Sequence, residues 1–193
     1  MKDLIIFAGP DRVGKSTLTE GILNLDTRDE IISCHHSAPN PKNESRWDEM
    51  FNNIRSFEIS KKRVLLVDRG WACTYIYQHI RHNSFDLSRE VSELERLLLT
   101  YNLRINYYLI YEPWQKVVLR HEHEIRKLFP GIKNWAMADM LENRKREHYN
   151  YYEAFETFAD EITLFNTNVL KGSEINPNTF YREKTYLRVL YAK

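Results

Sequence analysis

The amino-acid sequence predicts an α/β fold in three layers, with a five-stranded parallel sheet between two layers of helices. Apolar runs rich in β-branched residues alternate along the chain with longer stretches of helical spacing, which is the pattern of strands joined by crossover helices. The expected strands are 4–8, 31–34, 64–67, 105–111 and 162–165, and the expected helices are 16–25, 45–60, 71–82, 88–101, 114–127 and 136–158. Residues 174–193 are less patterned and end in a run that fits either a helix or a strand.

The length and composition of the chain indicate a single domain, residues 1–193, in the cytoplasm. A chain of 193 residues can bury a substantial core and is short for two ordinary domains. Its formal net charge of +1 provides no global field that would hold it on DNA or on a membrane. Cys34 and Cys73 form no disulfide framework and no metal-ligand spacing, which fits a reducing compartment. No run is long enough for a signal peptide core or a membrane span, so we expect no membrane partner.

A glycine-rich loop connects the first expected strand to the first expected helix. It fits the phosphate-binding pattern G-x-x-x-x-G-K-[ST] at every fixed position, with the sequence Gly9-Pro10-Asp11-Arg12-Val13-Gly14-Lys15-Ser16. The glycines let successive N–H groups turn toward phosphate oxygens, Lys15 adds a positive charge, and the Ser16 hydroxyl can bind Mg²⁺. The helix directs the positive end of its dipole at the same anion. A chance glycine turn would not require this order of strand, loop and helix, so the sequence predicts a site for a nucleoside polyphosphate.

The helix expected over 45–60 presents an aromatic ring and a cation on one face. Phe51 and Arg55 are four residues apart and therefore lie on the same side of that helix. The ring could stack on a base while the arginine reads its carbonyl edge. An ordinary core stripe closed by a surface arginine explains the same spacing equally well.

The strand expected over 64–67 ends in Asp68-Arg69. An acidic residue at the end of a buried strand beside a phosphate-binding loop is placed to organise Mg²⁺, so we expect Asp68 to join Ser16 as a metal ligand. Arg69 can bind a phosphate through two hydrogen bonds and cannot activate water as a base, which argues against a hydrolytic motor. A surface ion pair at a strand end is the structural alternative.

Two further segments follow strand ends, where open parallel sheets bind ligands. Trp71 and Tyr75 are one helical turn apart and could either line the acceptor pocket or pack in the core. Asn166 follows the expected strand 162–165, and we expect the adenine of the donor to lie near it. The segment 166–169 lacks the lysine and aspartate of guanine-specific switch proteins, which argues against a GTPase.

A Gly-x-Asp-Arg-x-Gly-Lys-Ser-Thr loop, here Gly9 to Thr17, combined with a strand ending in Asp68-Arg69 resembles the thymidylate kinase branch of the nucleoside monophosphate kinases. Deoxynucleoside kinases are close relatives. The resemblance covers most of the chain in element order, and only these two motifs are specific. It implies a P-loop NTPase fold that uses ATP and Mg²⁺ to phosphorylate the 5′-phosphate of a deoxynucleotide, with dTMP as the first candidate, and it suggests a homodimer.

The resemblance also implies roles for particular side chains. Asp11 would approach the acceptor sugar, and Arg12 would bridge the transferring phosphoryl group as an arginine finger supplied in cis. Phe51 and Arg55 match the aromatic-x-x-x-Arg pair of the corresponding family helix. The donor nucleotide and its metal are expected to contact Gly9, Asp11, Arg12, Val13, Gly14, Lys15, Ser16 and Thr17.

A short lid is implied at about 120–135, beginning within the helix expected over 114–127. In this family the lid contributes arginines that share the electrostatic task of the loop arginine. Arg120 or Arg126 is therefore expected to contact phosphate. The mixed charge of this stretch fits a solvated helix face as well.

Two other classes of function remain open. A kinase acting on a modified base or end within DNA is favoured by aromatic and basic residues in the tail, 174–193, although the near-neutral net charge weighs against nucleic acid. A non-catalytic nucleotide-binding module would tolerate loss of Arg12 or Arg69, so the presence of both favours an enzyme. A monophosphate acceptor needs no general base, whereas a nucleoside hydroxyl would require Asp11 or Asp68 in that role.

Overall fold

The computed structural model describes residues 2–35, 45–70, 73, 76, 77, 80, 88–161 and 166–171. The expected strand 162–165, most of the expected helix 71–82 and the tail lie outside these residues. Trp71 and Tyr75, the two aromatic candidates for the acceptor pocket, also lie outside them. In the part of the chain that is described, no helix combines the length and the apolar character that a bilayer span would need.

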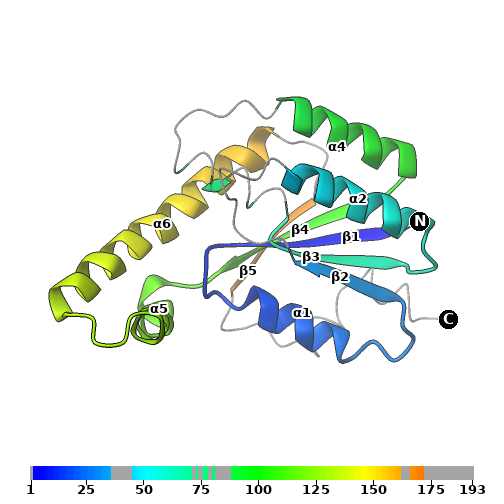
Figure 1. Cartoon of the computed structure of the whole chain (residues 1–193). Coiled ribbons are helices and arrows are strands. Elements are labelled where there is room, and N and C mark those ends of the chain that lie inside the picture. Colours follow the sequence, from blue (N-terminus) through cyan, green and yellow to red (C-terminus); the bar gives the residue numbers. More distant parts are fainter. Residues whose placement is uncertain are drawn as a thin grey trace.

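Five parallel strands form one sheet in the order β2-β3-β1-β4-β5 (Figure 1). The strands are β1 (Asp3–Ala8), β2 (Ile31–His35), β3 (Val64–Asp68), β4 (Arg104–Tyr111) and β5 (Asn166–Lys171). The predicted fold class is confirmed, and the first four strands match their expected ranges to within one residue. Because all the strands run the same way, their carboxyl ends meet at one edge of the sheet.

Helices cover both faces of the sheet and make the three predicted layers (Figure 1). They are α1 (Lys15–Leu23), α2 (Ser45–Ile59), α4 (Ser88–Tyr101), α5 (Trp114–Leu128) and α6 (Asn134–Glu161). Successive residues of β1 point to opposite faces. Leu4 and Ile6 pack in a cluster with α2, α4 and α6, whereas Ile5 and Phe7 pack with α1 and the start of α5.

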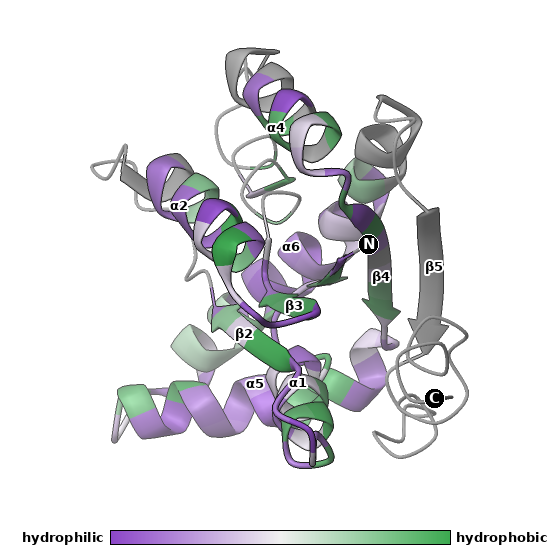
Figure 2. Cartoon of the chain, turned by 90° about the vertical axis from the view of Figure 1, so that its right-hand side faces the viewer, coloured by the Kyte–Doolittle hydropathy of each residue, from purple (hydrophilic) through white to green (hydrophobic). Residues whose placement is uncertain are grey.

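The central strands read as apolar runs because both of their faces are covered. Every residue of β1 and β3 is buried. Figure 2 shows largely hydrophobic colouring along β2, β3 and β4, and mixed colouring on the helices that cover them. This difference explains why the sequence locates the strands well.

The fifth strand is the exception. The apolar run 162–165 was expected to form it, and the structure instead places β5 at Asn166–Lys171, paired with β4 from Asn106 to Tyr111. β5 is an edge strand with a neighbour on one side only, so its position in the sheet does not demand an apolar sequence on both faces.

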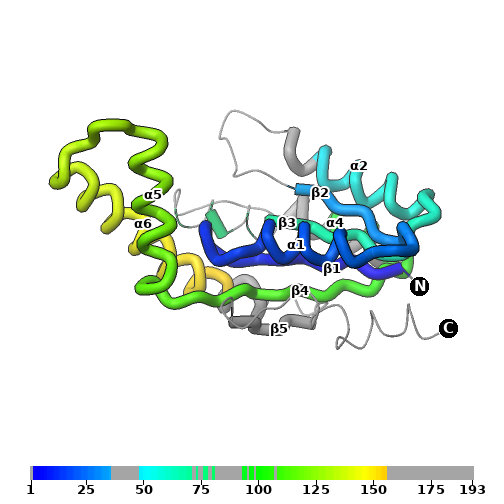
Figure 3. Tube along the Cα trace, turned by 90° about the horizontal axis from the view of Figure 1, so that it is seen from below, coloured from blue at the N-terminus to red at the C-terminus, as the bar shows by residue number. Residues whose placement is uncertain are grey.

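Helices α5 and α6 form a hairpin that projects beyond the carboxyl edge of the sheet (Figures 1 and 3). The turn between them spans 129–133. The region expected to act as a lid, 120–135, therefore comprises the second half of α5, this turn and the start of α6. The inner face of α5 lies beside the glycine-rich loop, as the contacts below show.

Candidate active site

The glycine-rich loop runs from the end of β1 to the start of α1, as predicted. Gly9 and Gly14 both have positive φ, +143° and +100°. A Cβ on Gly9 would lie 2.7 Å from the carbonyl oxygen of Ile110 in β4, whereas a Cβ on Gly14 would meet nothing within 4 Å. Arg12 also has a left-handed backbone, with φ of 68°. The loop therefore closes over the sheet only with small or strained residues at these positions.

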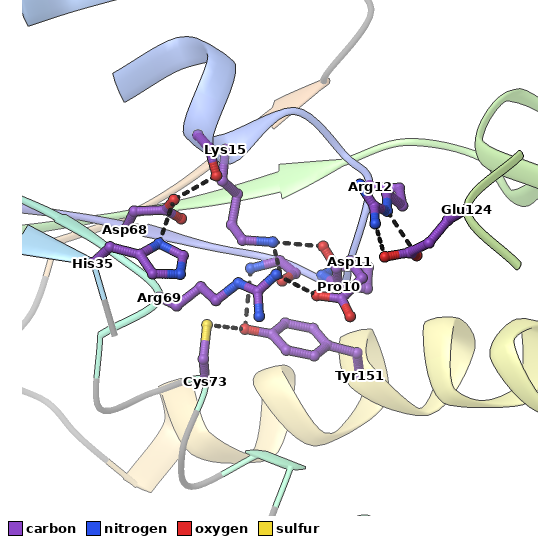
Figure 4. Close-up of polar contacts among 12 residues, drawn as sticks. Pro10, Asp11, Arg12, Lys15, His35, Asp68, Arg69, Cys73, Glu124 and Tyr151 are labelled. Atoms are coloured by element: carbon purple, nitrogen blue, oxygen red, sulfur yellow. Dashed lines mark hydrogen bonds and ion pairs between the residues drawn. The ribbon is translucent and has the colours of Figure 1, made fainter. Parts of the chain in front are cut away.

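Lys15 is buried under the loop and binds the loop's own backbone (Figure 4). Its Nζ donates to the carbonyl oxygens of Gly9, at 2.9 Å, and Pro10, at 2.6 Å. Burial lowers the pKa of Lys15 below its ordinary value, and the carboxylates of Asp11 and Asp68 oppose that effect. The ammonium group thus lies where the loop curls, which is the position a phosphate-binding lysine needs.

Ser16 and Asp68 meet at the carboxyl end of β3. The Ser16 hydroxyl donates to Asp68 Oδ2 at 2.6 Å, and the Nδ1–H of His35 donates to the same oxygen at 2.9 Å. Asp68 is almost fully buried, and its Oδ1 has no hydrogen-bond partner among the residues that the structure describes. A hydroxyl and a carboxylate, one of whose oxygens is unsatisfied, form an oxygen donor set that fits Mg²⁺.

Asp11 and Arg69 form an ion pair of 2.8 Å between NH2 and Oδ1 (Figure 4). Arg69 has a left-handed backbone, with φ of 65°. Burial would raise the pKa of Asp11, but the charges of Arg69 and Lys15 outweigh it and leave that pKa below its ordinary value. Asp11 is therefore a weak base in this arrangement.

Arg12 is held by helix α5. Its guanidinium contacts both carboxylate oxygens of Glu124, with 3.0 Å between Nε and Oε2, and NH2 paired with Oε1. Arg120, one turn earlier on the same helix, donates from NH1 to the backbone oxygen of Arg12 at 2.7 Å. Both contacts come from α5, so the hairpin binds the loop at an exposed residue.

Most of these side chains line a cavity of about 730 Å³ between the loop and α5. Its size is that of ordinary small-molecule sites. The cavity is lined by Asp11, Arg12, Val13, Gly14, Lys15, Ser16, Thr17, Leu18, Arg69, Leu119, Arg120, His123 and Glu124. The cavity thus brings together seven of the loop residues expected to contact the donor, the arginine that follows β3 and one of the two lid arginines, whereas Gly9 and Asp68 are not among its lining residues.

The second lid arginine is not at this cavity. Arg126 pairs with Glu122 at 2.8 Å, one helical turn away, and its side chain is mostly exposed. Residues 120 and 126 are separated by about 120° around a helix, so they face different directions. Of the two arginines given as alternatives, Arg120 lies at the cavity, whereas Arg126 belongs to the solvated face that the mixed charge also suggested.

The helix α2 candidates do not line the cavity either. Phe51 is buried in the cluster that packs α2 on the sheet. Arg55 pairs with Glu93 of α4 at 3.2 Å and lies over the Phe51 ring. The alternative interpretation, a core stripe closed by a surface arginine, describes what the structure shows, and the assignment of this pair to a base pocket is not supported.

Asn166 is also displaced from its expected role. It begins β5 and pairs in register with Asn106, well before the carboxyl edge where β4 ends at Tyr111. The adenine was expected beside Asn166 because the strand was assigned to the residues just before it. The carboxyl end of β5 is Lys171, so the residue expected beyond the strand end is in fact at its beginning.

Three contacts of the site could not be predicted from a motif. Glu124 and His35 reach Arg12 and Asp68 from distant parts of the chain. Tyr151 of α6 is fully buried, and its hydroxyl accepts from the N–H of Gly9 at 3.0 Å and lies 2.9 Å from Cys73 Sγ. The only available signal was the four-residue spacing that puts Arg120 and Glu124 on one face of a helix.

No protein-family model matches the chain, and no curated protein matches its sequence. Among solved structures, polyphosphate kinase 2 from Arthrobacter aurescens TC1 aligns with a TM-score of 0.65 at 13% identity, over 99% of this chain and 67% of that one. The YorR protein from Bacillus subtilis, in complex with phosphorylated GDP, aligns with a TM-score of 0.57 at 13% identity, over 98% of this chain and 97% of that one. Together with the loop between β1 and α1, these likenesses show that the chain has the fold of the P-loop NTPases.

Proposed function

We propose that the protein is a phosphotransferase that moves the γ-phosphoryl group of ATP, with Mg²⁺, to a deoxynucleoside monophosphate, dTMP first among them. The observation that carries this proposal is the convergence of loop and arginine side chains on one cavity, beside the hydrogen bond that joins Ser16 of its lining to Asp68. Its lining contains four basic side chains, Arg12, Lys15, Arg69 and Arg120, against two acidic ones, Asp11 and Glu124. A cavity with this excess of positive charge suits a polyanion.

The Ser16–Asp68 pair supports the assignment of a metal-dependent reaction. Ser16 would hold the ion from the loop, and Asp68 would hold it from the end of β3, directly or through water. Mg²⁺ bound there would neutralise charge on the donor phosphate oxygens. The His35 contact keeps the Asp68 carboxylate oriented toward the loop.

For the rest of the reaction, this chain has to position the substrates and to stabilise negative charge. Lys15 and the loop amides would hold the donor phosphates, and Arg12 would stabilise the negative charge that spreads over the transferring group. A monophosphate oxygen is already an ionised nucleophile, so no side chain has to remove a proton. The lowered pKa of Asp11 agrees with this scheme because it makes Asp11 a poor base.

A nucleoside hydroxyl is the second candidate acceptor, and the Asp11–Arg69 ion pair is the observation that favours it. An arginine that holds a carboxylate at 2.8 Å could orient that carboxylate as a base instead of binding the acceptor phosphate. The depressed pKa of Asp11 weighs against this role. We therefore keep the monophosphate as the first acceptor.

We propose in addition that residues 1–193 act as one kinase domain and that the region 120–135 serves as its lid. The placement of Arg120 at the cavity, on the helix that leads into this region, supports the lid assignment. The adenine of the donor would then rest against the cavity wall formed by α5, since the beginning of β5 is remote from the loop.

A phosphorylation screen tests the proposal. Labelled ATP is offered with Mg²⁺ to every deoxynucleoside, every deoxynucleoside monophosphate and DNA. GTP and inorganic polyphosphate are included as donors, because the solved structures with this fold include a polyphosphate kinase 2 and a protein bound to phosphorylated GDP. Transfer to monophosphates is expected. Labelling of DNA alone, with activity falling steeply as salt rises, would contradict the monophosphate assignment.

A further inference from the structure

Helix α5 engages Arg12 through both its backbone and its side chain. Arg120 donates to the Arg12 carbonyl. The carboxylate of Glu124 contacts the Arg12 guanidinium with both oxygens (Figure 4). Glu124 also lines the cavity that we assign to phosphates. A carboxylate at the wall of an anion-binding cavity repels the ligand, unless it forms an ion pair with a neighbouring cationic side chain.

The geometry of this pair is that of a phosphate contact. Arginine binds carboxylates and phosphates through the same fork of two parallel N–H donors. Here the fork consists of Nε and NH2 of Arg12, and the two oxygens of Glu124 occupy it. While that contact lasts, the same two donors cannot bind the oxygens of a phosphoryl group.

The pair is also exposed enough to exchange. The Arg12 side chain is 41% exposed and the Glu124 side chain is 31% exposed, so water screens their attraction. The other carboxylate of the cavity wall, Asp11, is paired with Arg69 in a more buried contact, with exposures of 30% and 23%. A ligand can therefore displace the Arg12–Glu124 ion pair more easily than the Asp11–Arg69 ion pair.

We propose that Glu124 is the positioning residue of Arg12. Its carboxylate stands in for phosphate oxygens, holds the guanidinium at the cavity wall, and releases it to the transferring phosphoryl group when the donor binds. The inference rests on the proposed function for the identity of the donor. What it adds is a competition between Glu124 and phosphate for one pair of N–H donors.

Competition has a consequence that simple repulsion does not have. Removing the Glu124 carboxylate should tighten phosphate binding because it frees Arg12, and the gain should vanish when Arg12 is absent. If Glu124 acted only as a negative charge near a polyanion, its removal would help equally with or without Arg12. A double-mutant cycle separates the two cases.

The test measures equilibrium binding by calorimetry, with Mg²⁺ and the β,γ-imido analogue of ATP as the probe. The proteins are the wild type, Glu124→Gln, Arg12→Ala and the double variant. We expect Glu124→Gln to tighten binding about threefold to fivefold, the upper part of the range that loss of a partly exposed competing ion pair allows. In the Arg12→Ala background the same change should shift binding by less than about twofold.

Glu122→Gln is the matched control. It removes the same charge from the same helix, but Glu122 pairs with Arg126 and does not line the cavity. Its binding should remain within about twofold of the wild type. Circular dichroism and thermal unfolding confirm that each variant is folded.

The outcomes distinguish the inference from the function it rests on. Equal tightening in both backgrounds, or no tightening by Glu124→Gln, overturns the role of Glu124 while leaving the kinase proposal intact. Inorganic tripolyphosphate with Mg²⁺ serves as a second probe, because the competition concerns phosphate alone. A wild type that binds neither probe refutes both proposals, and a wild type that binds with the expected coupling but phosphorylates no monophosphate refutes only the acceptor.

Discussion

The guanidinium of Arg69 lies 2.8 Å from the carboxylate of Asp11, so an ion pair ties the end of β3 to the phosphate-binding loop. Arg69 directly follows Asp68, whose carboxylate accepts from Ser16 in the same loop. The last residue of β3 and the residue that follows it therefore both contact the loop, Asp68 through the Ser16 hydroxyl and Arg69 through the Asp11 carboxylate. This arrangement fixes the loop relative to the strand.

Replacing Arg69 by alanine tests its role as an acceptor anchor. We expect the KM for the deoxynucleoside monophosphate to rise by tenfold or more, since a charge-assisted hydrogen bond contributes about 1.5–3 kcal/mol. The KM for ATP should change little. Steady-state kinetics with each substrate varied separately provide the measurement. A loss confined to kcat, matched by Asp11→Asn, would instead indicate that Arg69 orients a catalytic carboxylate.

Lys15 is expected to be indispensable for transfer. Lys15→Ala should abolish phosphorylation because the charge at the β- and γ-phosphates is lost. Lys15 is buried and binds two loop carbonyls, so Lys15→Met is the companion variant that fills the same space without the charge. Both should be inactive, and circular dichroism should show both folded. Normal turnover by a folded variant would contradict the assignment of this segment as a phosphate-binding loop.

Two substitutions of Arg12 separate the catalytic role of its side chain from the strain of its left-handed backbone. Arg12→Ala and Arg12→Gly should both lower kcat by roughly 10³-fold or more, with a smaller change in ATP affinity. Because Arg12 has φ of 68°, the glycine variant should be more stable than the alanine variant by about 1 kcal/mol. Urea unfolding of the two variants measures that difference. Equal stabilities would mean that the loop relaxes away from the left-handed conformation.

Tyr151 is expected to stabilise the phosphate-binding loop through its hydrogen bond to Gly9. Tyr151→Phe leaves the buried N–H of Gly9 without its partner, which should cost about 1–3 kcal/mol of unfolding free energy and raise the KM for ATP. Tyr152→Phe is the matched control, because its hydroxyl makes longer contacts of 3.3 Å and none with the loop. If neither variant altered the KM for ATP, Tyr151 would be a core residue only.

His121 should make the fold sensitive to acid. It is buried against Trp114, and burial lowers its pKa from 6.5 to about 4. Between these values the unfolded chain binds a proton that the folded chain does not, so the free energy of unfolding falls as the pH falls from 6.5 to about 4. The loss attributable to this group is on the order of 3 kcal/mol.

Urea unfolding at a series of pH values measures this dependence. His121→Gln should flatten the fall between these pH values, because glutamine does not titrate. His123→Gln, a change at an exposed position of the same helix, should leave the slope of the wild type unchanged. An unchanged slope in His121→Gln would assign the acid sensitivity to other groups.

The sequence predicted those elements whose structure depends on neighbouring residues in the chain. β1 and β3 are buried on both faces, and their apolar sequences revealed them to within one residue. The loop could be predicted in detail because its geometry depends on consecutive residues. β5 was misplaced because an edge strand, paired only with β4, can carry a polar sequence such as Asn166–Lys171.

The partners of the site residues could not be predicted, because they depend on how separate elements pack. Nothing local links Glu124 to Arg12, which are 112 residues apart, or Tyr151 to Gly9, which are 142 residues apart. Arg120 and Arg126 have similar surroundings in the sequence, and only the rotation of α5 against the loop separates them. For Phe51 and Arg55 the sequence left two explanations open, and the structure matches the core stripe closed by a surface arginine.

The two glycines of the loop are required for different reasons, which affects how degenerate loops should be recognised in other sequences. A side chain on Gly9 would collide with the backbone of β4, an obstacle that no rotamer avoids, whereas Gly14 has open space and needs only an unusual φ. Asparagine tolerates left-handed backbone better than other residues do. A divergent loop with asparagine at the position of Gly14 can therefore still be a phosphate-binding loop. A loop with any side chain at the position of Gly9 can be one only if the neighbouring strand of its sheet is displaced.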